Sequence, residues 1–311
     1  MNNRTKQRVR LFTSSVAIAG ATAGTPIPFN LQRGYRIHSL DIEFTDLTNA
    51  QTFGTVFGDI ILMVNDKAMR THNAAELAHL NNVNGSQYDL QANGTSGTDR
   101  TQSVTIYFSE PWRKDVGQAD AMAFNCDASW GVNSAKLLLY VAAGQTLSAT
   151  AGITVWAWVD GLQDASKAPT AGKQILKKVY RTSKTASGAF TEMGKDEFPP
   201  TRGQYQAVYF EQPTTSGTIQ YLTVKDGGPA GTVIYDKVKN YENWAFLTQR
   251  GMNPGVSQSA SGFGYDWIAD LLDPLQDAVP FTGEGPYFKL EYVSTAAGNI
   301  VALSEVLGYL D

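Results

Sequence analysis

The sequence predicts an all-β protein built from two sandwiches in tandem, and three observations support this prediction. Apolar and polar residues alternate with a period of two in short segments of both halves, as in strands with one buried face. Glycine accounts for 29 of the 311 residues and aromatic residues for 11%, while charged residues make up only 17%. This composition is typical of sheets and turns, and it favours a surface that is partly covered by other subunits.

The first half contains several strand patterns, each bounded by Gly, Asn, Asp, Ser or Pro. In the segment 153–159, apolar residues alternate with a second row that includes Trp156 and Trp158. Another apolar run ends at the pair Asn65-Asp66, which predicts a turn. The strands predicted in this half are 35–46, 60–64, 104–108, 137–141 and 153–159.

The second half repeats the pattern, and few segments of the chain have a helical period. Helices are expected at 74–80, 237–248 and 266–276, in loops rather than in alternation with strands, which argues against βαβ units. Strands are expected at 174–182, 205–211, 218–225, 232–236, 286–293 and 299–307.

The two β-rich halves are separated by the segment 161–173, which is polar, rich in small residues and contains one proline. We interpret this segment as a linker between domains. Eight-stranded jelly rolls are one of the few ways in which an antiparallel protein of this size protects its sheet edges. The sequence therefore predicts two tandem eight-stranded jelly-roll sandwiches with a few short helices in loops. Their bounds are a basic N-terminal arm at 1–30, a first jelly roll at 31–160 and a second at 174–311.

The N-terminal segment is strongly basic. Residues 1–40 contain six basic residues and no acidic one, so they carry +6, while the whole chain carries −4 at pH 7. Such an arm suits lipid headgroups or an anionic polymer, although a solvated, frayed terminus would explain the same charges. The layout also resembles a signal peptide, but polar residues at 13–15 interrupt its short apolar run. The four clustered basic residues are Arg4, Lys6, Arg8 and Arg10.

Residues suited to a catalytic or metal centre are sparse in the sequence. The three histidines, His38, His72 and His79, are scattered, and the single cysteine, Cys126, is expected to be a small buried residue. Glu76 and His79 have the spacing of a carboxylate–histidine metal helix, but with no second such element a solvated helix face is expected. The chain contains no HExxH, GxSxG or phosphate-loop motif. The sequence therefore predicts no enzymatic activity and no transition-metal site.

Four aspartates recur at spacings of four, three and four around the expected helix 266–276, which places them on one helical face. Because calcium prefers hard oxygen ligands, this face is a candidate site for a divalent cation or for a subunit contact. A solvated acidic face is the alternative. The four residues are Asp266, Asp270, Asp273 and Asp277.

The order of these segments resembles that of the double jelly-roll major capsid proteins of tailless, membrane-containing icosahedral bacteriophages, of the corticovirus and finnlakevirus kind. The matching segments are the arm MNNRTKQRVR, the strand ITVWAWVDG that closes the first half, the linker, and the final strands PYFKLEYVS and NIVALSEVLGYL. The resemblance implies a homotrimer whose six jelly rolls form a pseudo-hexagonal capsomer of the virion shell, assembled in the host cytoplasm. It also implies that the N-terminal segment lies beneath the shell, towards an internal membrane.

The partners implied are further copies of the chain, the internal lipid membrane, and minor capsid or spike proteins. For the arm, lipid is favoured over the packaged genome, because the arm lacks the interleaved aromatic residues of single-strand binders. A carbohydrate- or receptor-binding spike, fibre or lectin would also be rich in strands, with Trp112, Trp130 and Trp244 as candidate exposed contacts. A cupin-like enzyme would need a His/Glu metal cluster, which three scattered histidines argue against.

Overall fold

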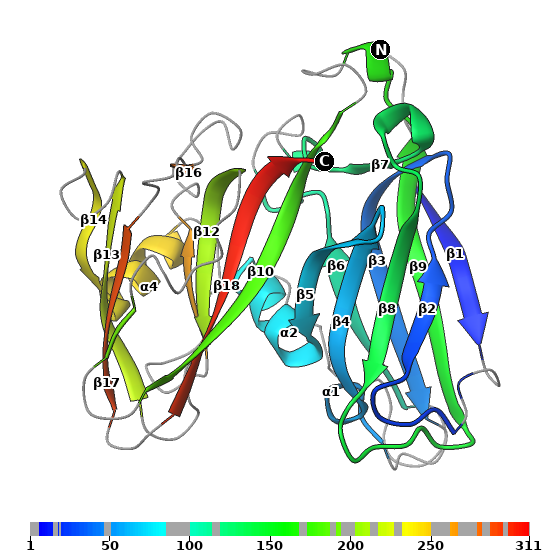
Figure 1. Ribbon diagram of the computed structural model, residues 1–311, viewed down its shortest axis with the longest axis horizontal. Helices are drawn as coiled ribbons and strands as arrows, with labels where there is room; N and C mark the ends of the chain where they lie inside the picture. The colour runs from blue at the N-terminus through cyan, green and yellow to red at the C-terminus, as the bar shows by residue number, and fades with distance from the viewer. Residues whose placement is uncertain are drawn as a thin grey trace. The chain divides into compact units, whose positions relative to one another are not determined.

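The structure is a computed structural model in which the chain divides into two compact units (Figure 1). The first unit comprises Met1–Asn81, Ser86–Leu176 and Tyr309–Asp311, and the second comprises Asn82–Gly85 and Lys177–Gly308. The residues that the structure describes are 6–14, 18, 20–46, 51–84, 100–113, 119–167, 173–186, 191–193, 203–211, 217–226, 232–249, 262–266, 279–281, 287–294 and 298–310.

The first unit is a sandwich of two antiparallel sheets. One sheet, which we call the β3 sheet after its longest strand, contains in order β1 (Gln7–Ser14), β9 (Ala151–Gly161), β3 (Tyr35–Asp46) and β6 (Arg100–Tyr107). The short strand β7 (Phe124–Cys126) also pairs with β3. The other sheet, the β4 sheet, contains in order β5 (Lys67–Asn73), β4 (Phe57–Val64), β8 (Ala135–Val141) and β2 (Pro26–Asn30).

Short helices lie in the connections of this unit. They are α1 (Phe53–Val56), α2 (Ala74–Val83) and two 3₁₀ helices at Ala128–Trp130 and Ala165–Lys167. Strands β4 and β5 are joined by Asn65 and Asp66, whose φ angles of 50° and 60° are those of a type I′ hairpin turn. The turn and the helix expected at 74–80 are therefore confirmed.

The core of the first unit lies between its two sheets (Figure 1). In β9 every second residue from Ile153 to Val159 is at most 1% exposed, which is the period of a strand with one buried face. Phe44, Phe53 and Phe57 form an aromatic cluster with ring centroids 5.0 to 6.1 Å apart. Full burial of each such side chain contributes about 1.5–3 kcal/mol.

The second unit is also built from two antiparallel arrangements. One contains in order β15 (Gly262–Asp266), β12 (Gly203–Glu211), β18 (Gly298–Tyr309) and β10 (Ile175–Ala186), with β16 (Val279–Phe281) also paired to β12. The other contains β11 (Thr191–Met193), β17 (Tyr287–Ser294), β13 (Gly217–Asp226) and β14 (Thr232–Lys239). Helix α4 (Asn240–Gln249) follows β14.

The two units share one strand order. In the first unit the β3 sheet reads β1–β9–β3–β6, and its counterpart in the second unit reads β10–β18–β12–β15. The order β2–β8–β4–β5 corresponds in the same way to β11–β17–β13–β14. The short strand β7 beside β3 has a counterpart in β16 beside β12. Two sheets of four strands in this order form an eight-stranded jelly roll, so the predicted fold class is confirmed.

The N-terminal segment differs from the predicted arm at 1–30. Strands β1 and β2 both fall within it, and they pair with β9 and β8 of the first unit. The physical reason is an alternation in β1: Val9 packs against the core, while Arg8 and Arg10 lie on the outer side. The first jelly roll therefore begins with β1 rather than at residue 31.

The boundary between the units also differs in detail from the prediction. Strand β9 ends at Gly161 and β10 begins at Ile175, so the expected linker 161–173 falls between two strands. The first unit nevertheless continues to Leu176. It also includes the end of the chain, where the Leu310 amide donates a hydrogen bond of 3.3 Å to the Gln174 carbonyl.

Two helix predictions need correction. Strand β14 continues to Lys239, so α4 begins later than the expected helix 237–248. The helix expected at 266–276 is wrong at its start, because Asp266 is the last residue of β15 and pairs with Ala207. Residues 267–276 lie outside the described part of the chain. Within the described part, no helix is long and apolar enough to cross a membrane.

Candidate functional site

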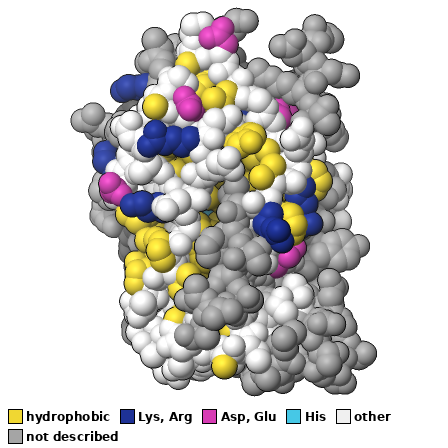
Figure 2. Space-filling model, turned by 90° about the vertical axis from the view of Figure 1, so that its right-hand side faces the viewer, with side chains coloured by type: hydrophobic (Ala, Val, Ile, Leu, Met, Phe, Trp, Pro, Cys, Tyr) yellow, Lys and Arg dark blue, Asp and Glu magenta, His cyan; other side chains and the backbone are white. Residues whose placement is uncertain are grey.

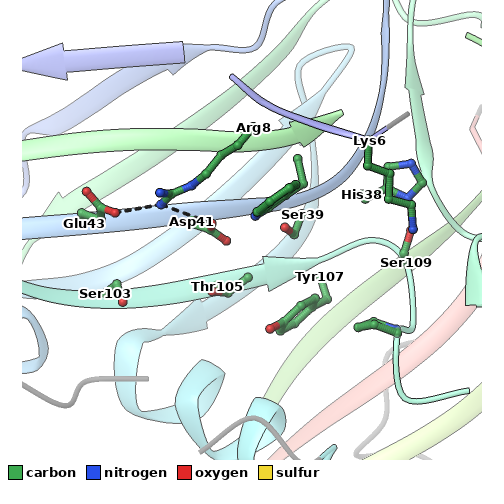
Figure 3. Close-up of a pocket in the computed structure, with 12 residues that line it drawn as sticks. Lys6, Arg8, His38, Ser39, Asp41, Glu43, Ser103, Thr105, Tyr107 and Ser109 are labelled. Atoms are coloured by element: carbon green, nitrogen blue, oxygen red, sulfur yellow. Dashed lines mark hydrogen bonds and ion pairs between the residues drawn. The ribbon is translucent and has the colours of Figure 1, made fainter. Parts of the chain in front are cut away.

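The outer face of the β3 sheet carries the candidate site. Because side chains alternate along a strand, the residues between the buried positions of β3, β6 and β9 point away from the core. Two tryptophans, Trp156 and Trp158, lie on this face of β9, and the carboxylates of Asp41 and Glu43 lie on β3. Arg8 of β1 reaches across β9 towards these carboxylates (Figure 3).

Arg8 is the centre of one group of contacts on this face. Its guanidinium lies 2.9 Å from the Glu43 carboxylate and 3.7 Å from that of Asp41. It also covers the Trp156 ring at 4.4 Å from the ring centroid, and Arg10 lies 5.7 Å from the same centroid. The Trp156 indole N–H donates a hydrogen bond of 2.9 Å to Glu43. The ring of Trp156 is thus held between a carboxylate and two cations.

A second group of charged residues lies at the N-terminal end of β3. Arg36 donates two hydrogen bonds to Asp160, of 2.8 and 2.6 Å, and both side chains are nearly buried. Lys6 lies 2.9 Å from Asp120. His38 lies between these pairs, with its Nδ1 2.6 Å from the Ser109 hydroxyl and 3.3 Å from Asp120.

The pKa values of this group follow from burial and from the neighbouring charges. Burial lowers the pKa of His38, and the carboxylate of Asp120 only partly opposes that effect. Burial alone would raise the pKa of Asp160, but the hydrogen bonds and charge of Arg36 hold it below the usual value. His38 is therefore neutral and Asp160 ionised near neutral pH.

The three basic residues of the predicted arm that the structure describes do not form a free cationic surface. Arg4 lies outside the described residues, Lys6 and Arg8 form ion pairs, and Arg10 lies near Trp156. The carboxylates that are hydrogen-bonded to Lys6 and Arg8 lie 114 and 35 residues away along the chain, which a local charge count cannot detect. Figure 2 shows basic, acidic and hydrophobic side chains interspersed on the face that it draws.

The candidate cation site is not assembled as a helical face. Asp266 lies in β15, and Asp270, Asp273 and Asp277 lie outside the described residues. Among the residues that are described, no group of three or more His, Cys, Asp or Glu side chains is arranged to hold a metal ion. The proposed calcium ligands therefore stay a prediction from the sequence.

The remaining histidines and the cysteine have structural surroundings. Glu76 caps α2 rather than facing solvent, because it accepts a hydrogen bond of 2.8 Å from the Asn73 amide, and Asn73 accepts one from Glu76. The expected solvated face is therefore wrong at Glu76, and burial lowers the pKa of His79. His72 is buried in β5. Cys126 is buried as expected, and burial raises its pKa to about 12.

A hollow of about 410 Å³ lies on the outer face of the β3 sheet, next to Arg8 (Figure 3). Its lining includes two acidic and two basic residues, Asp41, Glu43, Lys6 and Arg8, together with the exposed ring of Trp158. It also includes five hydroxyl side chains, Ser39, Ser103, Thr105, Tyr107 and Ser109.

Sequence reasoning did not select this hollow or Trp158. It chose three other tryptophans as exposed contacts, but Trp130 is buried and donates a hydrogen bond of 3.0 Å to the Gln163 carbonyl. Trp112 is partly buried against Tyr107, and the Trp244 side chain lies outside the described residues. The sequence did contain a signal for Trp158. It lies in the outward row of the alternating segment 153–159, whose side chains face away from the core.

Comparisons with known proteins identify solved structures that share this fold. The sequence matches no known family model and no curated protein. Solved structures similar to this chain include the major capsid protein P2 of bacteriophage PM2, at 16% identity and a TM-score of 0.70, over 99% of this chain and 98% of that one.

Two further structures are similar at comparable extent. A chain of the Sulfolobus turreted icosahedral virus is 14% identical with a TM-score of 0.65, over 98% of this chain and 90% of that one. A chain of the PBCV-1 virus capsid is 13% identical with a TM-score of 0.60, over 99% and 97%. Together with the repeated strand order, these similarities make the chain a double jelly-roll protein.

Proposed function

We propose that this chain is the major capsid protein of an icosahedral virus. The observation that carries the proposal is the repeat of one jelly-roll topology within a single chain, over nearly the whole length of the chain and of a phage major capsid protein. A fold shared at 16% identity does not by itself assign a function, so the proposal also depends on the chain's composition. The low charge of 17% suits a protein whose surfaces are covered by neighbouring subunits.

The assembly that we propose is a homotrimer. Two similar sandwiches in each subunit give a trimer six similar edges, and such a particle can tile a closed shell with one type of protein. Contacts with neighbouring capsomers, with spike or minor capsid proteins and with an internal lipid membrane belong to the same proposal. The role is structural, located in the virion, and needs no catalytic group.

A membrane-facing role of the N-terminal segment would depend on fewer free basic residues than the sequence suggested. Lys6 and Arg8 are paired with carboxylates, so a lipid headgroup would have to compete with Asp120 and Glu43 for them. Each basic residue near an anionic surface contributes about 1 kcal/mol, and pairing reduces that attraction. Of the described basic residues in this segment, Arg10 is the one that is not paired with a carboxylate, and it lies near the Trp156 ring.

The oligomeric state tests the proposal directly. Sedimentation velocity of the full chain should give a particle of three times the 33.8 kDa chain mass, and electron microscopy should show particles of hexagonal outline. An obligate interface of this kind buries more than about 2,000 Å². A monodisperse monomer at micromolar concentration would contradict the capsid assignment.

A liposome assay tests the membrane partner separately. Changing Arg10 to Gln should weaken binding of the trimer to anionic vesicles at low salt more than changing either of the paired residues Lys6 and Arg8 to Gln does. Equal binding of all variants to anionic and neutral vesicles would remove the membrane from the proposal but leave the capsid role in place.

A further inference from the structure

The hollow on the outer face of the β3 sheet has a geometry that the capsid role does not require. It extends over β3 and β6, with Asp41 and Glu43 from β3 and Ser103 and Thr105 from β6 lying along it (Figure 3). These strands are paired in register, with Asp41 opposite Thr105 and Glu43 opposite Ser103. The carboxylates of β3 therefore face the hydroxyl groups of β6, and both rows are held on a sheet rather than on a loop.

The two outward tryptophans of β9 differ in what covers them. Trp156 lies under the Arg8 guanidinium, so a face of its ring is already covered. Trp158 lines the hollow and is 40% exposed. The Asp41 carboxyl lies beside it. Burial raises the pKa of Asp41, and the charge of Arg8 together with side-chain hydrogen bonds to Thr105 and Trp158 opposes that rise. Trp158 is thus an exposed aromatic surface next to a fixed carboxylate.

The charge of the lining limits the class of ligand. Lys6 is held by Asp120, and Arg8 is held by Glu43 and Asp41, so the cations of the hollow are neutralised within the protein. An anionic ligand would have to displace these carboxylates. A purely apolar ligand would displace water from the carboxylates of Asp41 and Glu43 and from the hydroxyls of Ser39 and Ser103.

We infer that this hollow binds a neutral carbohydrate. One apolar face of a pyranose ring would lie on the exposed indole of Trp158, as aromatic side chains with a polar end allow. The sugar hydroxyls would donate to the carboxylates of Asp41 and Glu43 and exchange hydrogen bonds with Ser103 and Thr105. The volume of about 410 Å³ is within the range of small-molecule sites and accommodates one or two sugar units.

The inference is independent of the capsid assignment, because the site is built within one unit of one chain. For a virion protein, such a site would place the particle on glycan of a host surface or on glycan of a neighbouring virion protein. Both sources present the same chemistry, which is a neutral pyranose with free hydroxyls.

The test uses the purified full chain and defined probes. The methyl glycosides of glucose, galactose and mannose, together with N-acetylglucosamine, are titrated by saturation-transfer NMR and by intrinsic tryptophan fluorescence. At least one probe should bind in the millimolar range, which is the affinity expected when a single small ring is held on an open face. Absence of binding by all four probes would overturn the inference.

Matched variants locate the binding site. Trp158→Leu should weaken binding of the probe at least tenfold, and Thr105→Val should weaken it several-fold. Tyr309→Leu, which removes an exposed aromatic ring outside the hollow, should retain binding. If Trp158→Leu binds as well as the parent while its melting temperature is unchanged, the hollow is not the site and the inference is wrong. If sialic acid binds and every neutral probe fails, the charge argument is wrong.

Discussion

The first strand of each unit carries a basic residue paired with a carboxylate, but the two pairs have opposite surroundings. In the first unit, Arg8 on β1 is 39% exposed and pairs with Glu43, which is 28% exposed. In the second unit, Lys177 on β10 is 4% exposed and lies 3.1 Å from Glu305 of β18, which is 10% exposed. The first strand of the same topology therefore carries an exposed charge pair in the first unit and a buried charge pair in the second.

The difference shows what the repeated fold leaves free to vary. Strand order fixes which strands are neighbours. The surroundings of each sheet face decide how much a charge pair contributes to the free energy of unfolding. An exposed pair is screened by water and is worth about 0–1 kcal/mol. A buried pair contributes modestly as a whole, but loss of one partner leaves an uncompensated charge and is costly.

Removal of the buried lysine should have the largest effect. Lys177→Met leaves the Glu305 carboxylate buried opposite a neutral side chain, so unfolding free energy should fall by about 3–5 kcal/mol. Urea unfolding followed by circular dichroism measures the change. The double variant Lys177→Met with Glu305→Leu should recover most of the loss, and a single variant as stable as the parent would show that the pair is hydrated.

A buried pair in the first unit tests whether burial or the identity of the unit decides the effect. Asp160→Asn removes the charge that faces Arg36, whose remaining carboxylate is Asp120 at 3.9 Å. The loss of charged hydrogen bonds should cost about 2–3 kcal/mol by the same measurement. If the cost matched that of an exposed pair, burial would not explain the difference between the units.

The buried histidine gives the stability a pH dependence. Because burial lowers the pKa of His38 below 6.5, the unfolded chain binds a proton there while the folded chain does not. Stability should therefore fall as the pH drops from 6.5 through the folded pKa of His38. Asp160, whose pKa is held below 3.8, adds a further loss at lower pH.

The comparison with His38→Gln isolates this contribution. The variant should stay folded and show a flatter dependence of melting temperature on pH below 6.5, with His79 providing the remaining slope. An unchanged profile in the variant would show that His38 does not carry the dependence.

The exposed pair should have a small effect. Arg8→Gln should change unfolding free energy by less than about 1 kcal/mol, and added salt should reduce the change further. Arg8→Lys is the control, because it keeps the charge but loses the planar contact with Trp156. A loss as large as that of Lys177→Met would mean that the β1 edge is covered in the assembled protein.

The smallest effect is expected for metal removal. Since Asp266 lies in a strand, the four aspartates do not share one helical face, and EDTA should leave the melting temperature unchanged. A fall in melting temperature that added calcium reverses would restore the cation site through the binding linkage.

The alternation of apolar and polar residues was sufficient to predict the class of fold and most of its strands. The segment 153–159 has one period along its whole length, and the structure confirms its buried and outward rows. Strand β5, with the sequence KAMRTHN, was not predicted, because Arg70 and His72 are buried polar residues that interrupt the apolar pattern. The two tandem sandwiches were predicted, but the order of the strands within each sheet was not, since hydrogen-bonded neighbours far apart in the chain leave no short period in the sequence.

The sequence by itself determined that apolar and polar residues alternate as in sheets, that the chain has two β-rich halves and that it begins with a basic segment. Only the tertiary structure decided what that segment does. The alternation of Arg8, Val9 and Arg10 allowed either an arm or an edge strand, and pairing with β9 selected the strand. The carboxylates that neutralise Lys6 and Arg8 lie 114 and 35 residues away along the chain, so a sum of local charges could not anticipate them. Which of two identical outward tryptophans is covered and which is exposed depends likewise on contacts between strands, because the period of a strand fixes a side chain's face and not its neighbours.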